Sequence, residues 1–303
     1  MSVISSIHYI LALVCSPLLF GIINRTKALI AGRQGPPLLQ PYYDLFKLMN
    51  KGVVYSRATS WIFRAMPSVG LAAVLLALAL VPFGGGPALL TARGDWFLMI
   101  YLLGLARFFL VLAALDTGSS FEGMGASREV LFSALAEPAL LVGLAVLSRT
   151  TGALSLSDIY AGISHNSWAG MGPAILLVSA AFLVVLLAEN ARIPVDDPAT
   201  HLELTMIHEV MVLDVSGPDL ALVHYTSGLK LWLFSTLLTG ILLPLAEGHP
   251  LLNAGIAYGG LAATAVAVGL IESAMARLRL IRVPQLLAGA GALSILAFVL
   301  GMR

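Results

Sequence analysis

One short stretch of this sequence gathers much of the titratable chemistry of an otherwise apolar chain. Residues 189–214, ENARIPVDDPATHLELTMIHEVMVLD, hold six of the 16 Asp and Glu residues, together with Arg192, His201 and His208. Carboxylates and imidazoles at this density can relay protons or bind a charged partner. The two histidines are seven residues apart, without the HExxH spacing or a neighbouring cysteine, so no metal site is expected there.

The rest of the chain is too apolar for a soluble protein. Of its 303 residues, 59% are hydrophobic and 11% are charged, whereas about a quarter of the residues in soluble domains are charged. A net charge of +1 excludes the basic surface of a nucleic-acid-binding protein. The single cysteine, Cys15, cannot by itself build an iron–sulfur or nickel–iron centre. We therefore expect no catalytic residue, metal or cofactor on this chain itself.

Apolar segments that approach the length of a membrane span recur along the whole chain. A span needs about 20 apolar residues, and eight segments come near this length: residues 7–24, 65–83, 96–115, 130–148, 173–189, 231–246, 251–271 and 283–302. Residues 38–51, LLQPYYDLFKLMNK, place polar and apolar side chains on opposite faces, which predicts an amphipathic helix in the membrane interface. The predicted fold is an all-α polytopic membrane protein, with residues 1–303 as one integral-membrane domain.

The basic residues indicate how the chain is oriented. Lys and Arg favour cytoplasmic loops. If the N-terminus lies outside, the loops at about 25–64, 116–129, 190–230 and 272–282 face the cytoplasm and carry thirteen of the 17 Lys and Arg residues. We therefore expect a multi-pass protein of the cytoplasmic (inner) membrane, with the stretch 189–214 on its cytoplasmic side.

Several ionisable side chains fall within the apolar segments or at their ends. Charges in a bilayer are costly, so such residues are functional candidates by default. Together with acidic loop residues they form a candidate ion path from the cytoplasmic loops to mid-membrane: Glu129, Glu137, Arg107, Glu189, Asp196, Glu203, Lys230 and Glu272. The alternative is that they are ion pairs that only hold the helices together.

Three motifs resemble the family of complex I subunit 1, named after the mitochondrial protein. Residues 32–51 carry Arg, Gly-Pro, Gln, Asp and Lys at the spacing of that family's first cytoplasmic loop. Residues 126–138, ASREVLFSALAEP, keep its Arg-to-Glu interval, and residues 188–197, AENARIPVDD, resemble its Glu-x-x-Arg-x-Pro-x-Asp motif. The phrases LARFFLVLAALDTGSSF and GASRE are closer to the branch found in membrane-bound group 4 nickel–iron hydrogenases, which includes formate hydrogenlyase subunit 4 and hydrogenase-4 component C.

The resemblance implies a subunit that anchors a soluble electron-transfer module and links its chemistry to proton or sodium translocation. The implied partners are a hydrogenase-like large subunit and an iron–sulfur small subunit on the cytoplasmic side, which would hold the iron–sulfur and nickel–iron centres, and antiporter-like subunits in the membrane. We expect docking to involve a set of loop residues: Arg25, Arg33, Asp44, Lys47, Arg128, Arg192, Asp197, His201, Glu209 and Asp214.

The quinone-using branch of the same family provides an alternative, the quinone-chamber subunit of an NADH–quinone oxidoreductase. It predicts an amphiphile cavity between the first span, the interfacial helix and the sixth span. The acidic run of that branch, Glu-Ala-Glu-Gln-Glu-Leu, is here residues 199–204, ATHLEL, which disfavours a quinone and leaves room for a related complex without a nickel–iron site. An independent transporter is a third possibility, disfavoured because the sequence has no apparent inverted repeat.

Overall fold

The computed structural model describes residues 3–197, 205–244 and 250–302, and within these ranges it is built of helices, without strands. The all-α class is confirmed. The long helices are α1 (Val3–Ile30), α3 (Trp61–Ala79), α4 (Asp95–Asp116), α5 (Ser120–Thr151), α7 (His165–Glu189), α8 (Gly217–Leu242), α9 (Pro250–Ala274) and α10 (Val283–Leu300). The short elements are α2 (Gln40–Met49), α6 (Leu156–Gly162) and the 3-10 turns η1 (Glu209–Val212) and η2 (Leu280–Arg282).

Seven helices in the described ranges are long and apolar enough to cross a membrane, one fewer than the eight segments predicted. The helix that falls short is α8, although it is 26 residues long. It contacts α1, α2, α3, α7 and α9, so neighbouring helices rather than lipid surround much of it. A helix enclosed in this way does not need an apolar outer surface, and α8 carries Lys230 and several hydroxyl side chains.

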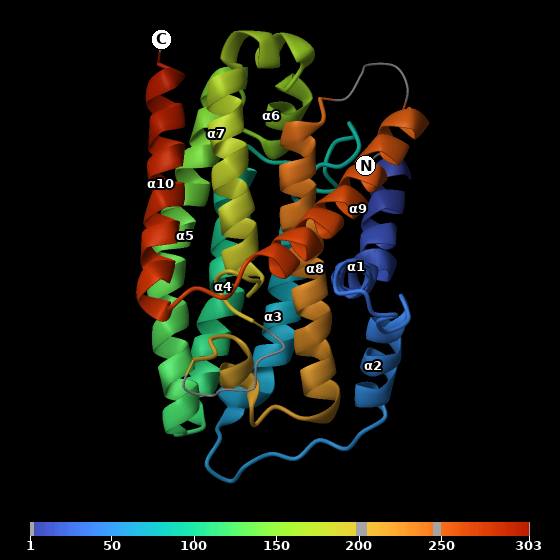
Figure 1. The fold of residues 1–303 in the computed structure, drawn as a ribbon, viewed down its shortest axis with the longest axis vertical. Helices are drawn as coiled ribbons and strands as arrows, with labels where there is room; N and C mark the ends of the chain where they lie inside the picture. The colour runs from blue at the N-terminus through green and yellow to red at the C-terminus, as the bar shows by residue number, and fades with distance from the viewer. Residues whose placement is uncertain (1–2, 198–204, 245–249, 303) are drawn as a thin grey trace.

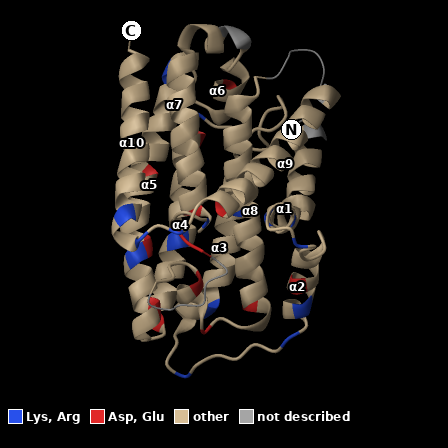
Figure 2. Cartoon of the chain, in the orientation of Figure 1, with Lys and Arg blue, Asp and Glu red and all other residues tan. Residues whose placement is uncertain are grey.

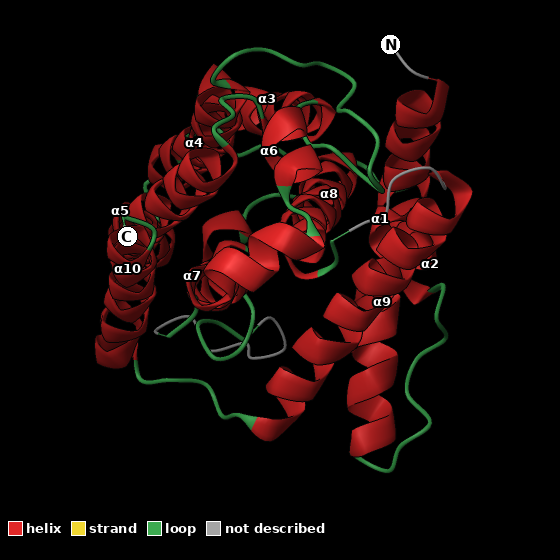
Figure 3. Ribbon diagram, turned by 90° about the horizontal axis from the view of Figure 1, so that it is seen from above, coloured by secondary structure: helices red, strands yellow, loops and turns green. Residues whose placement is uncertain are grey.

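The helices are arranged around α8. The hairpin of α3 and α4 packs on one part of the bundle, while α10 packs against α5 and α7. The pair formed by α1 and α9 lies on the other side of α8, and α9 crosses the bundle obliquely (Figures 1 and 3). Helix α2 contacts α8 and α1 and has no buried residue, as expected for an amphipathic helix at the edge of the bundle.

Two helices extend into loops that the sequence predicts. Helix α5 begins at Ser120, so Glu129 lies on a helix rather than in a loop at 116–129. Helix α8 begins at Gly217, which shortens the predicted loop 190–230 to residues 190–216. Both helices start among polar residues, which is why hydropathy alone places their starts too late.

Pro17 shapes the part of α1 that faces α2 and α8. A proline has no N–H to donate to the carbonyl four residues earlier, so the Leu13 carbonyl is open. The hydroxyl of Tyr225 on α8 donates to it at 2.8 Å, and the hydroxyl of Tyr42 on α2 donates to the Val14 carbonyl at 2.6 Å. In Figure 1 the first half of α1 stands upright and its second half is seen end-on. The two hydrogen bonds therefore link α1 to α8 and to α2 next to the bend.

Charged side chains are unevenly distributed along the bundle. Most Lys, Arg, Asp and Glu residues gather in the half that contains α2 and the segments 31–60, 190–197, 205–216 and 275–282, and few lie in the other half (Figure 2). We call these halves the loop end and the far end; both chain termini lie toward the far end. The distribution agrees with the predicted grouping of the loops, while the side that faces the cytoplasm stays a prediction.

Candidate functional site

Arg107 is the centre of an ion-pair cluster where α4, α5, α7 and α8 meet. Its guanidinium contacts Glu137, lies 2.5 Å from Glu189 and lies 3.3 Å from Glu129. Lys230 extends the cluster, because its Nζ lies 2.8 Å from the second oxygen of Glu189. These five residues, here called the Arg107 cluster, come from four helices and were all predicted as ion-path candidates.

The Arg107 cluster has one carboxylate more than it has cations. When all five groups are ionised, its three carboxylates and two cations give a net charge of −1. The side chains of Arg107 and Glu189 are only 8% and 6% exposed, so their charges depend on each other rather than on water. The surplus carboxylate allows the cluster to accept one proton or one monovalent cation and still pair both of its own cations.

Glu137 lies at the outer edge of this cluster. Its side chain is 37% exposed, against 8% for Arg107. It lies beside Gly104 on α4, where a Cβ would be in ordinary contact, 3.9 Å from the Glu137 carboxylate. Tyr101 and Phe108, one turn on either side of Gly104, are 75% and 56% exposed. The carboxylate therefore opens onto an apolar outer surface of α4 and α5.

A second cluster, here called the Glu272 triad, joins α1, α9 and the loop after α7. The side chain of Glu272 is fully buried, 2.7 Å from Lys27 and 3.3 Å from Arg192. The guanidinium of Arg192 also lies over the Phe20 ring, 4.7 Å from its centre. Burial lowers the pKa of Arg192 below its ordinary value, and the Glu272 carboxylate opposes this shift. With two cations and one carboxylate, the triad has a net charge of +1.

Asp196 anchors the loop after α7. It is 2% exposed, and its Oδ2 accepts the backbone N–H groups of Ile207 and His208 at 3.1 Å each. Its Oδ1 lies 2.9 Å from the guanidinium of Arg277, which also donates to the Thr205 carbonyl. Asp196 therefore fixes the first part of this loop to residues 207–208 and to the segment that follows α9.

The last part of the loop packs directly on α5. A Cβ at Gly125 would overlap the Val210 side chain and lie 2.9 Å from that of Met211, so only glycine permits this contact. Glu122, one turn earlier, is fully buried and accepts the backbone N–H of Asp214 at 3.2 Å. This last part of the loop is thus packed into the bundle rather than a free surface segment.

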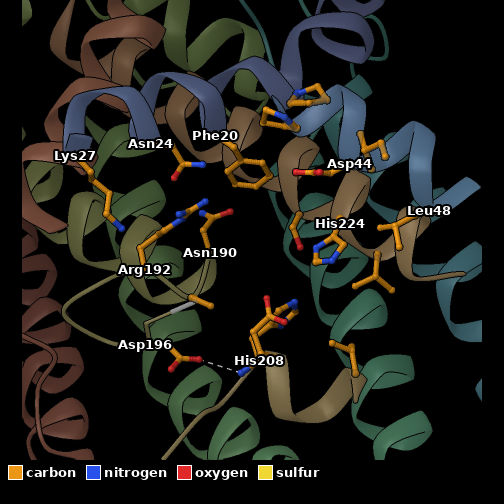
Figure 4. Close-up of a pocket in the computed structure, with 18 residues that line it drawn as sticks. Phe20, Asn24, Lys27, Asp44, Leu48, Asn190, Arg192, Asp196, His208 and His224 are labelled. Atoms are coloured by element: carbon orange, nitrogen blue, oxygen red, sulfur yellow. Dashed lines mark hydrogen bonds between the residues drawn. The ribbon is translucent and has the colours of Figure 1, made fainter. Parts of the chain in front are cut away.

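Two separate cavities with shared lining residues lie between the loop and the Arg107 cluster. The larger, of about 470 Å³, lies between α1, α2, α8 and the loop, where Arg192, His208 and His224 surround one space (Figure 4). The smaller, of about 70 Å³, reaches Arg107 and Lys230 among its lining residues. His208 lines both cavities and therefore lies between them. We call them the large and the middle cavity.

The structure separates the predicted docking residues by exposure. Those on the surface are Arg25, Arg33, Asp44, Lys47 and Asp214, and those that are half-buried are Arg128, Asp197 and Glu209. Arg192 is buried in the Glu272 triad, so its contacts are internal. His201 and the ion-path candidate Glu203 lie outside the described residues.

Sequence reasoning left four residues out of its candidate lists that the fold brings to these sites: Lys27, Glu122, His208 and His224. Lys27 was counted only among the basic loop residues, but it pairs with Glu272. His208 was noted within the stretch 189–214 and His224 lies outside it, and no local pattern predicts that the two line one cavity. Within the described ranges, no group of three or more His, Cys, Asp or Glu side chains is arranged to hold a metal ion.

Comparison with known sequences identifies relatives over nearly the whole length. The family model described as NADH dehydrogenase matches residues 3–301. Formate hydrogenlyase subunit 4 of Escherichia coli (strain K12) is 31% identical over 290 residues, which cover 94% of this chain and 93% of that protein. Hydrogenase-4 component C of the same strain is 33% identical over 249 residues, 80% of this chain and 75% of that protein.

More distant similarity extends to a third kind of relative and to a solved structure. An NADH-quinone oxidoreductase subunit of Burkholderia vietnamiensis (strain G4 / LMG 22486) is 26% identical over 215 residues, 68% of this chain and 60% of that protein. A chain in the structure of the membrane-bound sulfane sulfur reductase, an archaeal respiratory membrane complex, superposes with a TM-score of 0.84 at 20% identity and 98% coverage of both chains. At that identity the superposition shows a common fold.

Proposed function

This chain belongs to the NADH dehydrogenase family of complex I subunit 1 type, and from that membership we propose that it is the membrane-anchor and ion-coupling subunit of a group 4 hydrogenase or a related complex. In this role it docks a soluble electron-transfer module at its loop end and links the module's redox chemistry to the movement of protons or sodium ions. The large subunit and the iron–sulfur small subunit of that module carry the redox centres.

The observation that carries this proposal is the arrangement of the two cavities around His208. The large cavity lies at the loop end, where the soluble module docks, and the middle cavity reaches the Arg107 cluster. A change of charge in the large cavity therefore acts on His208, and through it on Lys230 and Arg107. Since an imidazole can both donate and accept a proton through its two ring nitrogens, His208 is chemically suited to this position.

The surplus carboxylate of the Arg107 cluster provides the next step. An ion that arrives from the middle cavity neutralises one of three carboxylates, and the two cations then redistribute between the remaining two. Glu137 is the most exposed of the three, at 37% against 17% for Glu129 and 6% for Glu189. The ion leaves the cluster on the side of Glu137.

The exposure of Glu137 also supports a membrane partner. A carboxylate facing hydrocarbon is costly, whereas one that faces a polar group of another protein is not. The flanking surface, with Tyr101 and Phe108, is apolar and suits a transmembrane helix. An antiporter-like subunit covering α4 and α5 would satisfy both features.

The decisive experiment replaces Glu137 by Gln in the complete complex. Gln keeps the size and a hydrogen-bond acceptor for Arg107 but not the charge. We expect the complex to assemble and its redox turnover to continue, while ion movement per electron pair is lost. Glu122→Gln is the matched control, because Glu122 is buried on the same helix outside the Arg107 cluster. Unchanged ion movement in the assembled Glu137 variant would exclude this role.

A second candidate function is supported by the large cavity itself. It lies between α1, α2 and α8, where a quinone-reducing complex needs an amphiphile site, and Phe20, Leu45 and Leu48 give it apolar walls. If a quinone binds there, Leu48→Trp should displace quinone from the purified complex and abolish quinone reduction. A purified wild-type complex that neither contains quinone nor binds an added short-chain quinone would exclude it.

A further inference from the structure

A histidine at the far end of the bundle is buried with an unused nitrogen. His8, on α1, is 8% exposed. Its Nδ1 lies 2.8 Å from the hydroxyl oxygen of Tyr258 on α9. Its Nε2 is buried without a hydrogen-bond partner among the described residues. Buried polar atoms without a partner are rare, and they commonly mark the position of a water molecule.

A small cavity next to His8 has room for that water. It measures about 30 Å³ and is lined on its polar side by Ser5, Tyr9 and Thr236 as well as His8. A water molecule needs roughly 10–15 Å³ of such space. A Cβ at Gly84 would lie 3.6 Å from Nε2, an ordinary contact distance, so the chain at Gly84 passes close to this nitrogen without bonding to it. We call this space the far cavity.

The surroundings hold the imidazole in one orientation. The Phe83 ring lies with its centre 4.8 Å from that of His8 and 4.8 Å from that of Tyr258, and Trp232 packs behind them. Two further titratable side chains lie at this site: Tyr258 on α9, which contacts His8, and Tyr9 on α1, which lines the far cavity and whose hydroxyl donates to the Leu75 carbonyl at 3.1 Å. Among the residues that the structure describes, no Asp, Glu, Lys or Arg lines the far cavity. The charge state of His8 is thus not fixed by an ion in that lining.

The contact between α1 and α8 contains further unused polar atoms. The hydroxyls of Ser16 and Ser235 are buried without a partner among the described residues. Gly228 lies against the backbone of Ser16, and Ser235, seven residues later on α8, is on the same helix face as Gly228. Pro17, beside Ser16, lines the large cavity. Spare hydrogen-bonding capacity therefore recurs between the large cavity and His8.

We infer that the far cavity holds water and that His8 is a proton-exchange site at the end of the bundle opposite the coupling loop. In the neutral state Nδ1–H donates to Tyr258, and Nε2 keeps a lone pair for water. A proton delivered by hydronium binds Nε2 and leaves water behind; the imidazolium then donates from both nitrogens, to Tyr258 and to the water. The reverse step returns the proton to water.

The direct test measures the protonation of His8 in the assembled complex. With ¹⁵N-labelled histidine, the His8 resonance is the one missing from His8→Gln. We expect it to change from neutral imidazole to imidazolium as the pH falls from about 8 to about 5. A His8 resonance that stays in one state over this range overturns the proposal.

The functional test uses ion movement per electron pair and rests on the proposed function. His8→Gln and Tyr258→Phe should both reduce it, while redox turnover and assembly persist. Tyr160→Phe is the control, since it removes another buried hydroxyl, which donates to the Leu237 carbonyl away from the far cavity. If both His8 and Tyr258 variants transport ions like the wild type, His8 has no part in transport. If Glu137→Gln also leaves transport unchanged, the proposed function fails with it.

Discussion

The Arg107 cluster and the Glu272 triad are built from opposite charge patterns. In the first, one arginine contacts three carboxylates, and the surplus charge is negative. In the second, one carboxylate contacts two cations, and the surplus charge is positive. The first lies where four helices meet, whereas the second joins two helix ends to a loop beside the large cavity.

The difference indicates two separate tasks. A surplus carboxylate can accept a proton without leaving a cation unpaired, so the Arg107 cluster suits ion transfer. The Glu272 triad has no surplus carboxylate, and protonation of Glu272 would leave both of its cations unpaired. It therefore suits a structural role, fixing the loop after α7 to α1 and α9 and giving the large cavity a positive wall. Six of the eight predicted ion-path residues thus divide between two clusters with different chemistry, while Asp196 pairs separately with Arg277.

The largest effect should follow from removing the hub of the Arg107 cluster. Arg107→Gln leaves three carboxylates with Lys230 alone. Breaking a buried ion pair in this way costs about 3–5 kcal/mol, so we expect little assembled complex in membranes. Arg107→Lys should recover part of the yield, because it restores the charge but not the planar guanidinium, whose five N–H donors reach several carboxylates at once. If Arg107→Gln assembled with the wild-type yield and transported ions like the wild type, Arg107 would not be needed to hold the cluster together.

Removing the hub of the triad should have a smaller effect. Glu272→Gln leaves Lys27 and Arg192 unpaired, but Lys27 is 29% exposed and can turn toward the large cavity. We expect the complex to assemble with lower thermal stability and to keep most of its ion movement per electron pair. Loss of transport with intact assembly would mean that both clusters belong to one ion path.

The sequence predicted the helices and the charged residues well, but not how the charges are divided. The apolar segments and the intramembrane positions of Arg107 and Glu137 can be read locally, because each span must satisfy the bilayer by itself. The contacts of Arg107 with Glu129 and Glu189 depend on how α4, α5 and α7 pack, which no local pattern encodes. Hence all five residues of the Arg107 cluster were predicted as ion-path candidates. That Glu272 belongs to a separate cluster was not predicted.

The loop after α7 is the region where sequence reasoning was least complete. A dense group of charges indicated a surface for partners, yet Arg192 and Asp196 are buried by their own ion pairs. Burial of a charge depends on a partner distant in sequence, here Glu272 on α9 and Arg277 just after it. The cavity beside this loop was predicted only through family resemblance, since cavities arise from packing between elements.

A moderate effect is expected at Asp196, which belongs to neither cluster but holds the loop beside both. Asp196→Asn keeps an acceptor for the backbone N–H groups and loses the ion pair with Arg277. We expect faster amide hydrogen exchange in residues 205–212, with the helices unaffected. Asp196→Glu is the control that keeps the charge. Amide exchange as slow as in the wild type would show that the hydrogen bonds from Ile207 and His208 hold this part of the loop without the ion pair.

The smallest effect on the chain itself should come from its exposed docking residues. Asp44 and Lys47 on α2 are exposed and belong to neither cluster, so reversing both charges should change the stability of this subunit by less than about 0.5 kcal/mol. The soluble module should nevertheless dissociate at lower salt, because exposed charges act at a distance only while salt is low. The double reversal leaves the net charge unchanged, so weaker binding would report the position of these charges; reversal of Arg57, exposed in the segment between α2 and α3, is the comparison that changes the net charge at another position of the loop end. A module that stays bound in the Asp44 and Lys47 variant at every salt concentration tolerated by the wild type would move the docking surface away from α2. That result would not change the conclusion that the Arg107 cluster and the Glu272 triad carry opposite surplus charges.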